Sequence, residues 1–278
     1  MCVSGGSVIR TLSLVALALA LARASPARAA DPFEIQVYDG TANDRGGFGL
    51  EAHLNHVANG LREAVAPELA PDKQTHLTLE PSYGVTNWWE LGAYFQTAVR
   101  KDGAFDYAGT KFRSKLVTPP GWHEHVRLGL NFELALLPAT YDPDRFGVEV
   151  RPIAAWESAH VLLAINPIVG VSLAGAGLKA GPSLEPAALG LVKIQETVGI
   201  GVEYYSSLGP VGSGLLPVSQ QEHYVYEVAH LISEENVELS WGAGEGLTEG
   251  SNRLVFKVIV GYSFDRNRTP RAPSTRGR

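Results

Sequence analysis

The sequence predicts an all-β protein, a transmembrane antiparallel up-and-down β-barrel of about 12 strands. Three observations predict it: apolar and polar residues alternate along most of the chain after residue 46, the alternating segments are long, and their connections alternate between long and short. Period-two alternation indicates strands with chemically different faces, because successive side chains point to opposite sides.

Twelve segments alternate in this way. In one of them, residues 126–136, Leu and Phe side chains share one face while Arg127, Asn131 and Glu133 share the other. Most of the segments exceed ten residues, whereas strands of soluble proteins usually have about five or six. A tilted strand that crosses an outer membrane needs about 9–11. The length favours a membrane barrel over a secreted soluble barrel or sandwich. The segments are 47–57, 75–85, 88–99, 105–117, 123–136, 146–156, 160–172, 182–194, 197–207, 222–231, 236–246 and 252–264.

The connections support the same architecture. Every second gap is five residues or shorter, and these short gaps are 86–87, 118–122, 157–159, 195–196 and 232–235. The gaps between them run from five to seventeen residues. Long external loops on one rim and short periplasmic turns on the other are typical of outer-membrane barrels. With both termini periplasmic, the longer gaps lie outside.

Aromatic residues gather near the ends of the segments. Trp88, Trp89, Trp122 and Trp156 lie at or beside short turns, and Phe264 ends the last segment at the same rim. Interfacial girdles of aromatic side chains anchor membrane barrels, whereas a soluble sandwich would place them mid-strand in its core.

The last segment carries a family resemblance. KVIVGYSF, residues 257–264, resembles the C-terminal insertion signal of bacterial outer-membrane β-barrel proteins, although fourteen residues follow Phe264. That resemblance implies the outer membrane of a Gram-negative-type bacterium and insertion by the barrel-assembly machinery. In size and pattern the chain also resembles the barrels grouped with phenol-degradation (MetA-type) outer-membrane proteins, which implies uptake of small hydrophobic or aromatic compounds.

The remaining parts of the chain flank the predicted barrel at residues 47–264. Arg10, an apolar run at 12–22 and the Ala-Arg-Ala site at 27–29 predict a signal peptide over residues 1–29. Residues 30–46 contain an alternating stretch, FEIQVYDG, which fits a periplasmic segment, a plug in the lumen or an extension of the first strand. Residues 265–278 hold five Arg and predict a disordered basic tail.

Composition excludes several classes of protein. The chain has 23 Lys+Arg against 29 Asp+Glu, and this acidic balance argues against nucleic acid as a partner. A single cysteine, Cys2, excludes a disulfide scaffold and a thiolate metal site. The expected partners are outer-membrane lipids, lipopolysaccharide and small solutes.

The polar faces of the strands are expected to line the lumen. Two alternatives are open for their charges. Opposed basic and acidic ladders could select polar solutes in a pore. The same charges could instead pair with neighbours and fill the barrel, since eight strands are filled and sixteen leave a channel. The candidates are the basic residues Lys111, Arg113, Lys115 and Arg127 and the acidic residues Glu80, Glu90, Glu133, Glu203, Glu227 and Glu238.

Candidates for catalysis or metal binding are weak. Ser172, His223 and Glu227 are a conceivable triad, but nothing in their spacing selects them. His53 and His56 are three apart and fall on opposite faces of a strand, whereas His123 and His125 could share a metal. No zinc signature or phosphate loop is present. The sequence therefore predicts no catalytic, cofactor or metal site.

Four prolines interrupt the alternating segments. Pro81, Pro152, Pro167 and Pro186 each lack the N–H that a strand ladder uses, so we expect local breaks or bulges.

The function predicted from these features is a passive pore or transporter for small solutes. Two alternatives remain open: an outer-membrane barrel hydrolase acting on lipid or lipopolysaccharide, and a closed structural or adhesive barrel.

Overall fold

The structure is a computed structural model, and it describes residues 31–64, 66–195, 197–212, 214–232 and 236–264. The predicted signal peptide, residues 1–29, and the predicted basic tail, residues 265–278, lie outside the described residues.

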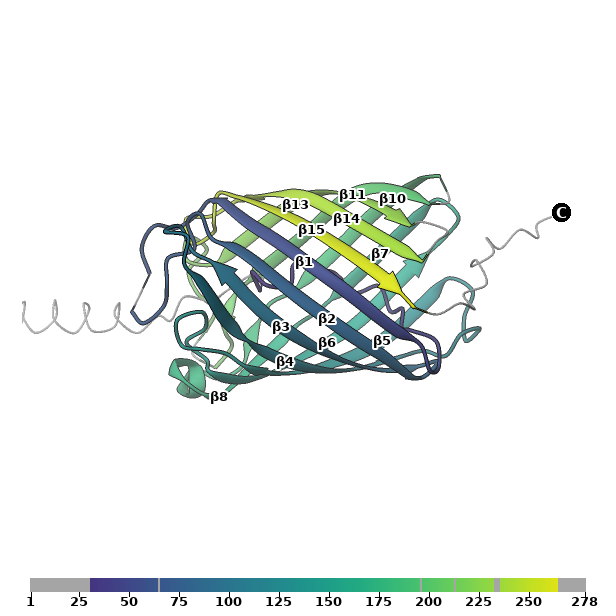
Figure 1. Cartoon of the computed structure of the whole chain (residues 1–278), viewed down its shortest axis with the longest axis horizontal. Helices are drawn as coiled ribbons and strands as arrows, with labels where there is room; N and C mark the ends of the chain where they lie inside the picture. The colour runs from purple at the N-terminus through teal and green to yellow at the C-terminus, as the bar shows by residue number, and fades with distance from the viewer. Residues whose placement is uncertain (1–30, 65, 196, 213, 233–235, 265–278) are drawn as a thin grey trace, which may run out of the picture.

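The described chain forms a closed antiparallel β-barrel (Figure 1). The ring follows the chain order, with β7 and β8 both paired with β6, and β1 pairs with β15 to close it. The fifteen strands form twelve segments that cross the barrel wall, here called staves. Three staves consist of two consecutive strands each: β7 with β8, β9 with β10, and β11 with β12. Each stave overlaps one predicted segment, and β12 lies beyond the predicted end of its segment at residue 207. The twelve-strand all-β fold is confirmed. The strands are β1 (Phe48–Asn59), β2 (Thr75–Thr86), β3 (Trp89–Val99), β4 (Phe105–Val117), β5 (Val126–Leu136), β6 (Phe146–Glu157), β7 (Val161–Asn166), β8 (Val169–Ala174), β9 (Ser183–Leu184), β10 (Ala187–Gln195), β11 (Val198–Ser207), β12 (Gly209–Pro210), β13 (Glu222–Ile232), β14 (Val237–Gly246) and β15 (Leu254–Ser263).

Two of the four prolines divide staves. Pro167 lies between β7 and β8, and Pro186 lies between β9 and β10. Pro152 stays within β6 but lies where the partner of β6 changes from β8, at Val150, to β7, at Ala154. Pro81 stays within β2 and leaves a gap in its register with β3. The missing proline N–H accounts for each interruption.

One short turn is longer than predicted. The segment expected to begin at residue 123 begins at Val126, and residues 118–125 form the connection. The ring nitrogen Nδ1 of His123 accepts hydrogen bonds from the backbone N–H groups of His125 and Val126, both 3.1 Å away. His123 therefore shapes a turn at the end of β4 rather than extending β5.

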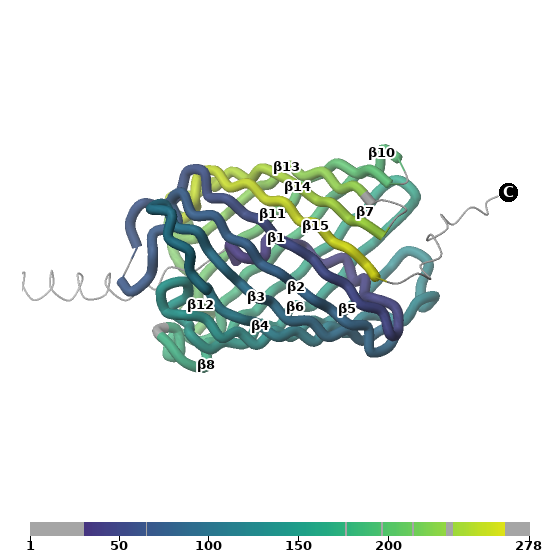
Figure 2. The backbone as a smooth tube through the Cα atoms, in the orientation of Figure 1, coloured from purple at the N-terminus to yellow at the C-terminus, as the bar shows by residue number. Residues whose placement is uncertain are grey.

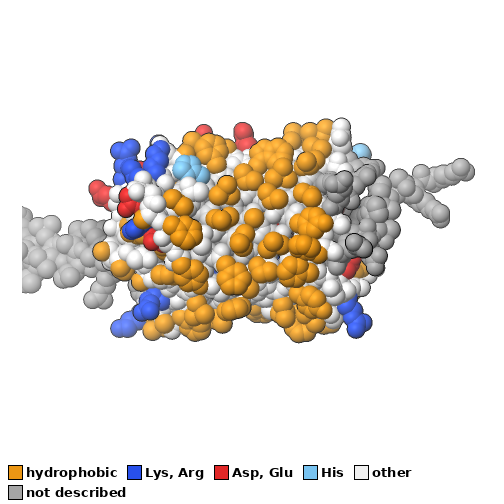
Figure 3. Space-filling view, in the orientation of Figure 1, with side chains coloured by type: hydrophobic (Ala, Val, Ile, Leu, Met, Phe, Trp, Pro, Cys, Tyr) orange, Lys and Arg blue, Asp and Glu red, His pale blue; other side chains and the backbone are white. Residues whose placement is uncertain are grey.

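The outer face of the barrel is apolar. Figure 3 shows a band of hydrophobic side chains across the strands, with charged side chains gathered at the two ends. Leu54, Phe95 and Phe132 are among the exposed large apolar residues of this band. At the end of the last strand, the ring of Phe264 lies 5.3 Å from that of Phe48 and 4.8 Å from that of Tyr262. A contiguous apolar band of this kind suits contact with lipid.

Among the described residues, the structure contains no helix with the length and hydropathy to span a membrane.

Candidate functional site in the barrel lumen

Residues 31–46, the luminal segment, pass through the inside of the barrel. They form the purple trace seen behind β1 in Figure 2. Near its start, Phe33 packs against Tyr141 in the loop between β5 and β6. Near its end, the backbone N–H of Arg45 donates to Asn87, in the turn between β2 and β3, over 2.8 Å. The segment thus runs from the rim of long loops to the rim of short turns.

Hydrogen bonds from the barrel wall hold this segment along its length. Lys257 Nζ donates to the carbonyl of Ile35 over 3.0 Å, and Arg127 Nε donates to the carbonyl of Asp39 over 2.8 Å. Near the short-turn rim, the N–H of Asn43 donates to Glu90 over 2.6 Å. The wall therefore satisfies backbone groups that a strand would otherwise pair.

Asn166, the last residue of β7, makes two of these contacts by itself. Its Oδ1 accepts the backbone N–H of Tyr38 over 2.7 Å, and its Nδ2 donates to the Tyr38 carbonyl over 3.0 Å. This is the pattern of a paired strand residue, supplied here by a side chain. Asn166 is fully buried.

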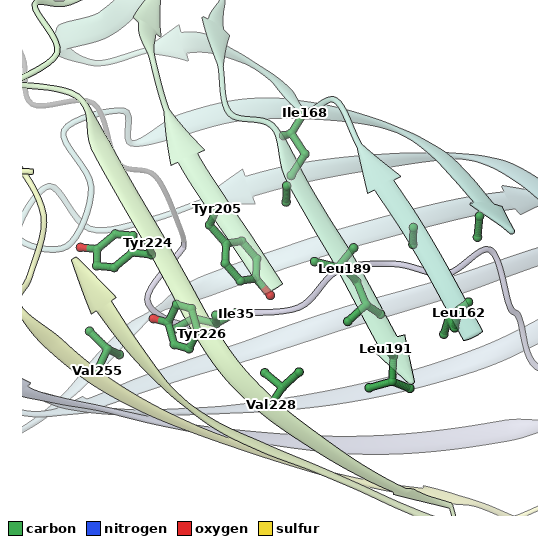
Figure 4. Close-up of a cluster of buried hydrophobic side chains, with 14 of the residues drawn as sticks. Ile35, Leu162, Ile168, Leu189, Leu191, Tyr205, Tyr224, Tyr226, Val228 and Val255 are labelled. Carbon is green, nitrogen blue, oxygen red and sulfur yellow. The ribbon is translucent and has the colours of Figure 1, made fainter. Parts of the chain in front are cut away.

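The luminal segment separates two unlike halves of the barrel interior. Ile35 and Val37 join a buried cluster with inward residues of β7, β10, β11 and β13, including Leu189, Tyr205 and Tyr226 (Figure 4). Alternate residues of the segment face polar partners: Glu34 and Tyr38 reach the polar half, which inward residues of β2 to β6 form. The alternation of residues 34–38, EIQVY, therefore matches one apolar and one polar wall, whereas Phe33 packs in a separate cluster with Ala98, Ala108 and Tyr141.

The polar half contains most of the charges predicted for the lumen, and they pair with one another. Lys111 forms ion pairs with Asp31 of the luminal segment and with Glu133 at 3.3 Å. Arg113 forms ion pairs with both Glu80 and Glu90, and its Nη1 lies 2.7 Å from Glu90 Oε1. Lys115 contacts Glu90 at 2.9 Å. The proposed basic ladder is thus neutralised by carboxylates on neighbouring strands.

The remaining lumen candidates are distributed more widely. Arg127 pairs with Asp39 at 3.0 Å and with Glu157. Outside the polar half, Glu203 of β11 forms an ion pair with Lys257 of β15, and both side chains are almost completely buried. Glu238 borders a small cavity at the short-turn end.

Glu227 does not belong to the lumen. Its side chain is exposed on the outer face, while Tyr226 and Val228 on either side of it are buried inside. The prediction placed the charged residue inward, whereas in β13 the aromatic face is the inner one. Among the described residues, no hydrogen bond links the three residues considered as a triad: His223 contacts Tyr204 and Gln221, and Ser172 Oγ has no hydrogen-bond partner.

Several residues that organise the lumen were missed by sequence reasoning. Tyr38 and Tyr94 share a hydrogen bond of 2.6 Å between their hydroxyls at the centre of the polar half. Asn166 lies in the segment 160–172, which is otherwise largely apolar. A lone Asn between apolar residues just before a proline was the available signal for Asn166.

Two cavities adjoin the packed region. One of about 50 Å³ near the short turns is lined by Asn43, Glu51, Glu90 and Glu238 among others. Another of about 380 Å³ at the long-loop rim is bordered by Arg62, Leu69, Asp72 and Arg100 among others. At that rim, the N–H of Gly60 and the ammonium of Lys101 hold the pKa of Asp72 below its usual range.

Comparison with known proteins identifies the fold. No family model matches the chain, and no curated protein matches it. The COG4313 outer membrane channel from Pseudomonas putida F1 is similar in structure, with a TM-score of 0.58 at 12% identity, covering 83% of this chain and 100% of the other. The KdgM porin is similar with a TM-score of 0.54 at 10% identity, covering 78% and 99%. The chain has the fold of bacterial outer-membrane barrels.

Proposed function

We propose that this protein is an outer-membrane channel for the passive passage of small solutes, with the luminal segment lying in the path. The neighbouring structures are described as a channel and a porin, which supports a pore or transporter. In this proposal the signal peptide directs export, the barrel-assembly machinery inserts the barrel, and lipid and lipopolysaccharide contact its apolar face.

The observation that carries the proposal is the two-sided lumen. The luminal segment presents Ile35 to an apolar wall and Glu34 to a polar one. A solute that replaced the segment would meet the same two walls. This favours solutes with an apolar body and a polar group, in agreement with the resemblance to barrels for small hydrophobic or aromatic compounds.

Passage requires the segment to move, because the central lumen side chains are buried against it. Asn166 holds the segment by two hydrogen bonds. A hydrogen bond contributes about 0.5–1.5 kcal/mol net. Losing two should raise the population of the displaced segment by about 5- to 150-fold.

Planar-bilayer recording tests this mechanism. A chain lacking residues 32–43 should conduct steadily, and Asn166→Ala should open more often than the unsubstituted chain. Trp241→Phe, on the outer face of β14, is the matched control and should leave the recordings unchanged.

A folded barrel that stays silent in all these variants would support a closed structural or adhesive barrel instead. If the deletion prevents folding, Asn166→Ala decides the question, because it leaves the chain length unchanged.

A further inference from the structure

Three potential metal ligands meet on the inner face of β1 and β2. Glu51 and His53 are two residues apart on one face of β1, and Glu80 is the register partner of Glu51 on β2. His53 Nε2 lies 3.2 Å from Glu80 Oε2 and 3.6 Å from Glu51 Oε2. All three ligand atoms lie within 4.8 Å of one another.

These separations suit a small four-coordinate cation. Zn²⁺ binds imidazole nitrogen and carboxylate oxygen at about 2.0–2.2 Å in tetrahedral geometry, so neighbouring ligand atoms lie about 3.3 Å apart. The two distances to His53 Nε2 bracket that value. An imidazole with two carboxylates is a donor set suited to first-row transition metals.

The cluster lies among further carboxylates. Four carboxylates lie close together here: Glu51 and Glu80 face each other across β1 and β2, Glu90 shares Arg113 with Glu80, and Glu238 lies beyond Gly261. Arg113 pairs with Glu80 and Glu90, and Lys115 pairs with Glu90.

A cavity that borders Glu51, and one further polar atom, lie beside the cluster. The cavity of about 50 Å³ adjoins Glu51 and Glu238, and one water molecule needs about 10–15 Å³. Thr78, the register partner of His53, is fully buried, and its hydroxyl has no hydrogen-bond partner among the described residues. A metal-bound water at the remaining coordination position would give such a hydroxyl a partner.

We propose that Glu51, His53 and Glu80 bind one divalent first-row transition-metal cation inside the lumen, for which Zn²⁺ is the probe. Gln36 of the luminal segment donates to Glu51 Oε2 over 3.3 Å. The bound cation would therefore connect β1, β2 and the luminal segment through one carboxylate. The binding site does not depend on whether the barrel conducts solutes.

Zn²⁺ titration of the folded mature chain in detergent tests the proposal, after removal of metals with a chelator. The background variant His123→Ala/His125→Ala removes two histidines at a turn. We expect one Zn²⁺ per chain, with affinity reduced more than about 10-fold in His53→Ala and in Glu51→Gln. His56→Ala is the matched control and should bind normally, because His56 lies on the opposite face of β1 and contacts Thr75.

Zn²⁺ binding that His53→Ala leaves unchanged would be adventitious and would overturn the proposal. A folded chain that binds no Zn²⁺ would overturn it as well. If the variants do not fold, X-ray absorption of the Zn²⁺-loaded unsubstituted chain decides: one imidazole among oxygen ligands supports the site, and several imidazoles contradict it.

Discussion

Lys257 illustrates how single charged residues are accommodated in this lumen. Its side chain is 1% exposed, donates to the carbonyl of Ile35 and forms an ion pair with Glu203. The pair sits beside the rings of Tyr205 and Tyr226. A buried pair of this type stabilises little relative to apolar residues, but breaking it leaves an uncompensated charge.

Lys257→Met should therefore destabilise the barrel by about 3–5 kcal/mol, because Glu203 loses its counter-charge. The double variant Lys257→Met/Glu203→Gln should recover part of that loss. Urea unfolding in lipid vesicles measures both. Equal stability of the single and double variants would contradict the assignment of the cost to an unpaired carboxylate.

Glu227→Leu should have the opposite effect. Glu227 is exposed midway along β13, where Val202 and Ala243 are its register partners. A charged side chain on the lipid face near the membrane centre is unfavourable, less so for Glu than for Lys or Arg. Replacement by Leu should stabilise the folded barrel in vesicles by less than about 2 kcal/mol. The matched control Glu245→Leu, near the rim, should change stability less.

Side-chain orientation was predictable from the sequence where one face of a strand is charged and the other apolar. In β4 the alternation of Lys111, Arg113 and Lys115 with Phe112 indicates both faces correctly. In β13 both faces are largely apolar, because the adjoining lumen wall is apolar too. Glu227 is the charged residue midway along β13, and placing charged residues inward is a rule that fails where the lumen wall is apolar.

At the scale of elements, the sequence predicts where the strands lie, but it predicts only some of the places where they are interrupted. Period-two alternation is local, so the segments emerge from the chain itself. The position of the luminal segment is not local: Asn43, Asp39 and Ile35 are held by residues 47, 88 and 222 positions away in sequence. FEIQVYDG alone fits three placements because its partners lie on strands distributed around the ring.

Backbone amides where β6 meets β7 and β8 should exchange their hydrogens faster than amides in uninterrupted strands. Ladder pairing stops at Val150 with Val169 and resumes at Ala154 with Ile165. Hydrogen exchange with mass spectrometry should show earlier labelling of residues 166–168 than of β3. Equal protection would mean that contacts other than ladder bonds protect this wall.

For the whole molecule, average composition conceals the arrangement. Mean hydropathy is -0.00, the value of an ordinary soluble protein, yet the apolar residues divide between the outer band and one wall of the lumen. The alternation predicts the barrel, but it does not predict whether the lumen is open. That property depends on residues 31–46, outside the predicted barrel.

The path of the luminal segment also bears on the order of assembly. Residues 31–46 lie inside a ring that β1 and β15, the first and last strands, close by pairing. Once β1 and β15 have paired, the chain preceding β1 cannot pass into the lumen through the barrel wall. It is therefore either enclosed while β15 pairs with β1, or it enters later through one end of the barrel. Joining a rigid, folded domain to Asp31 should therefore slow the final pairing of β15 with β1, whereas the same domain joined after Phe264 should not.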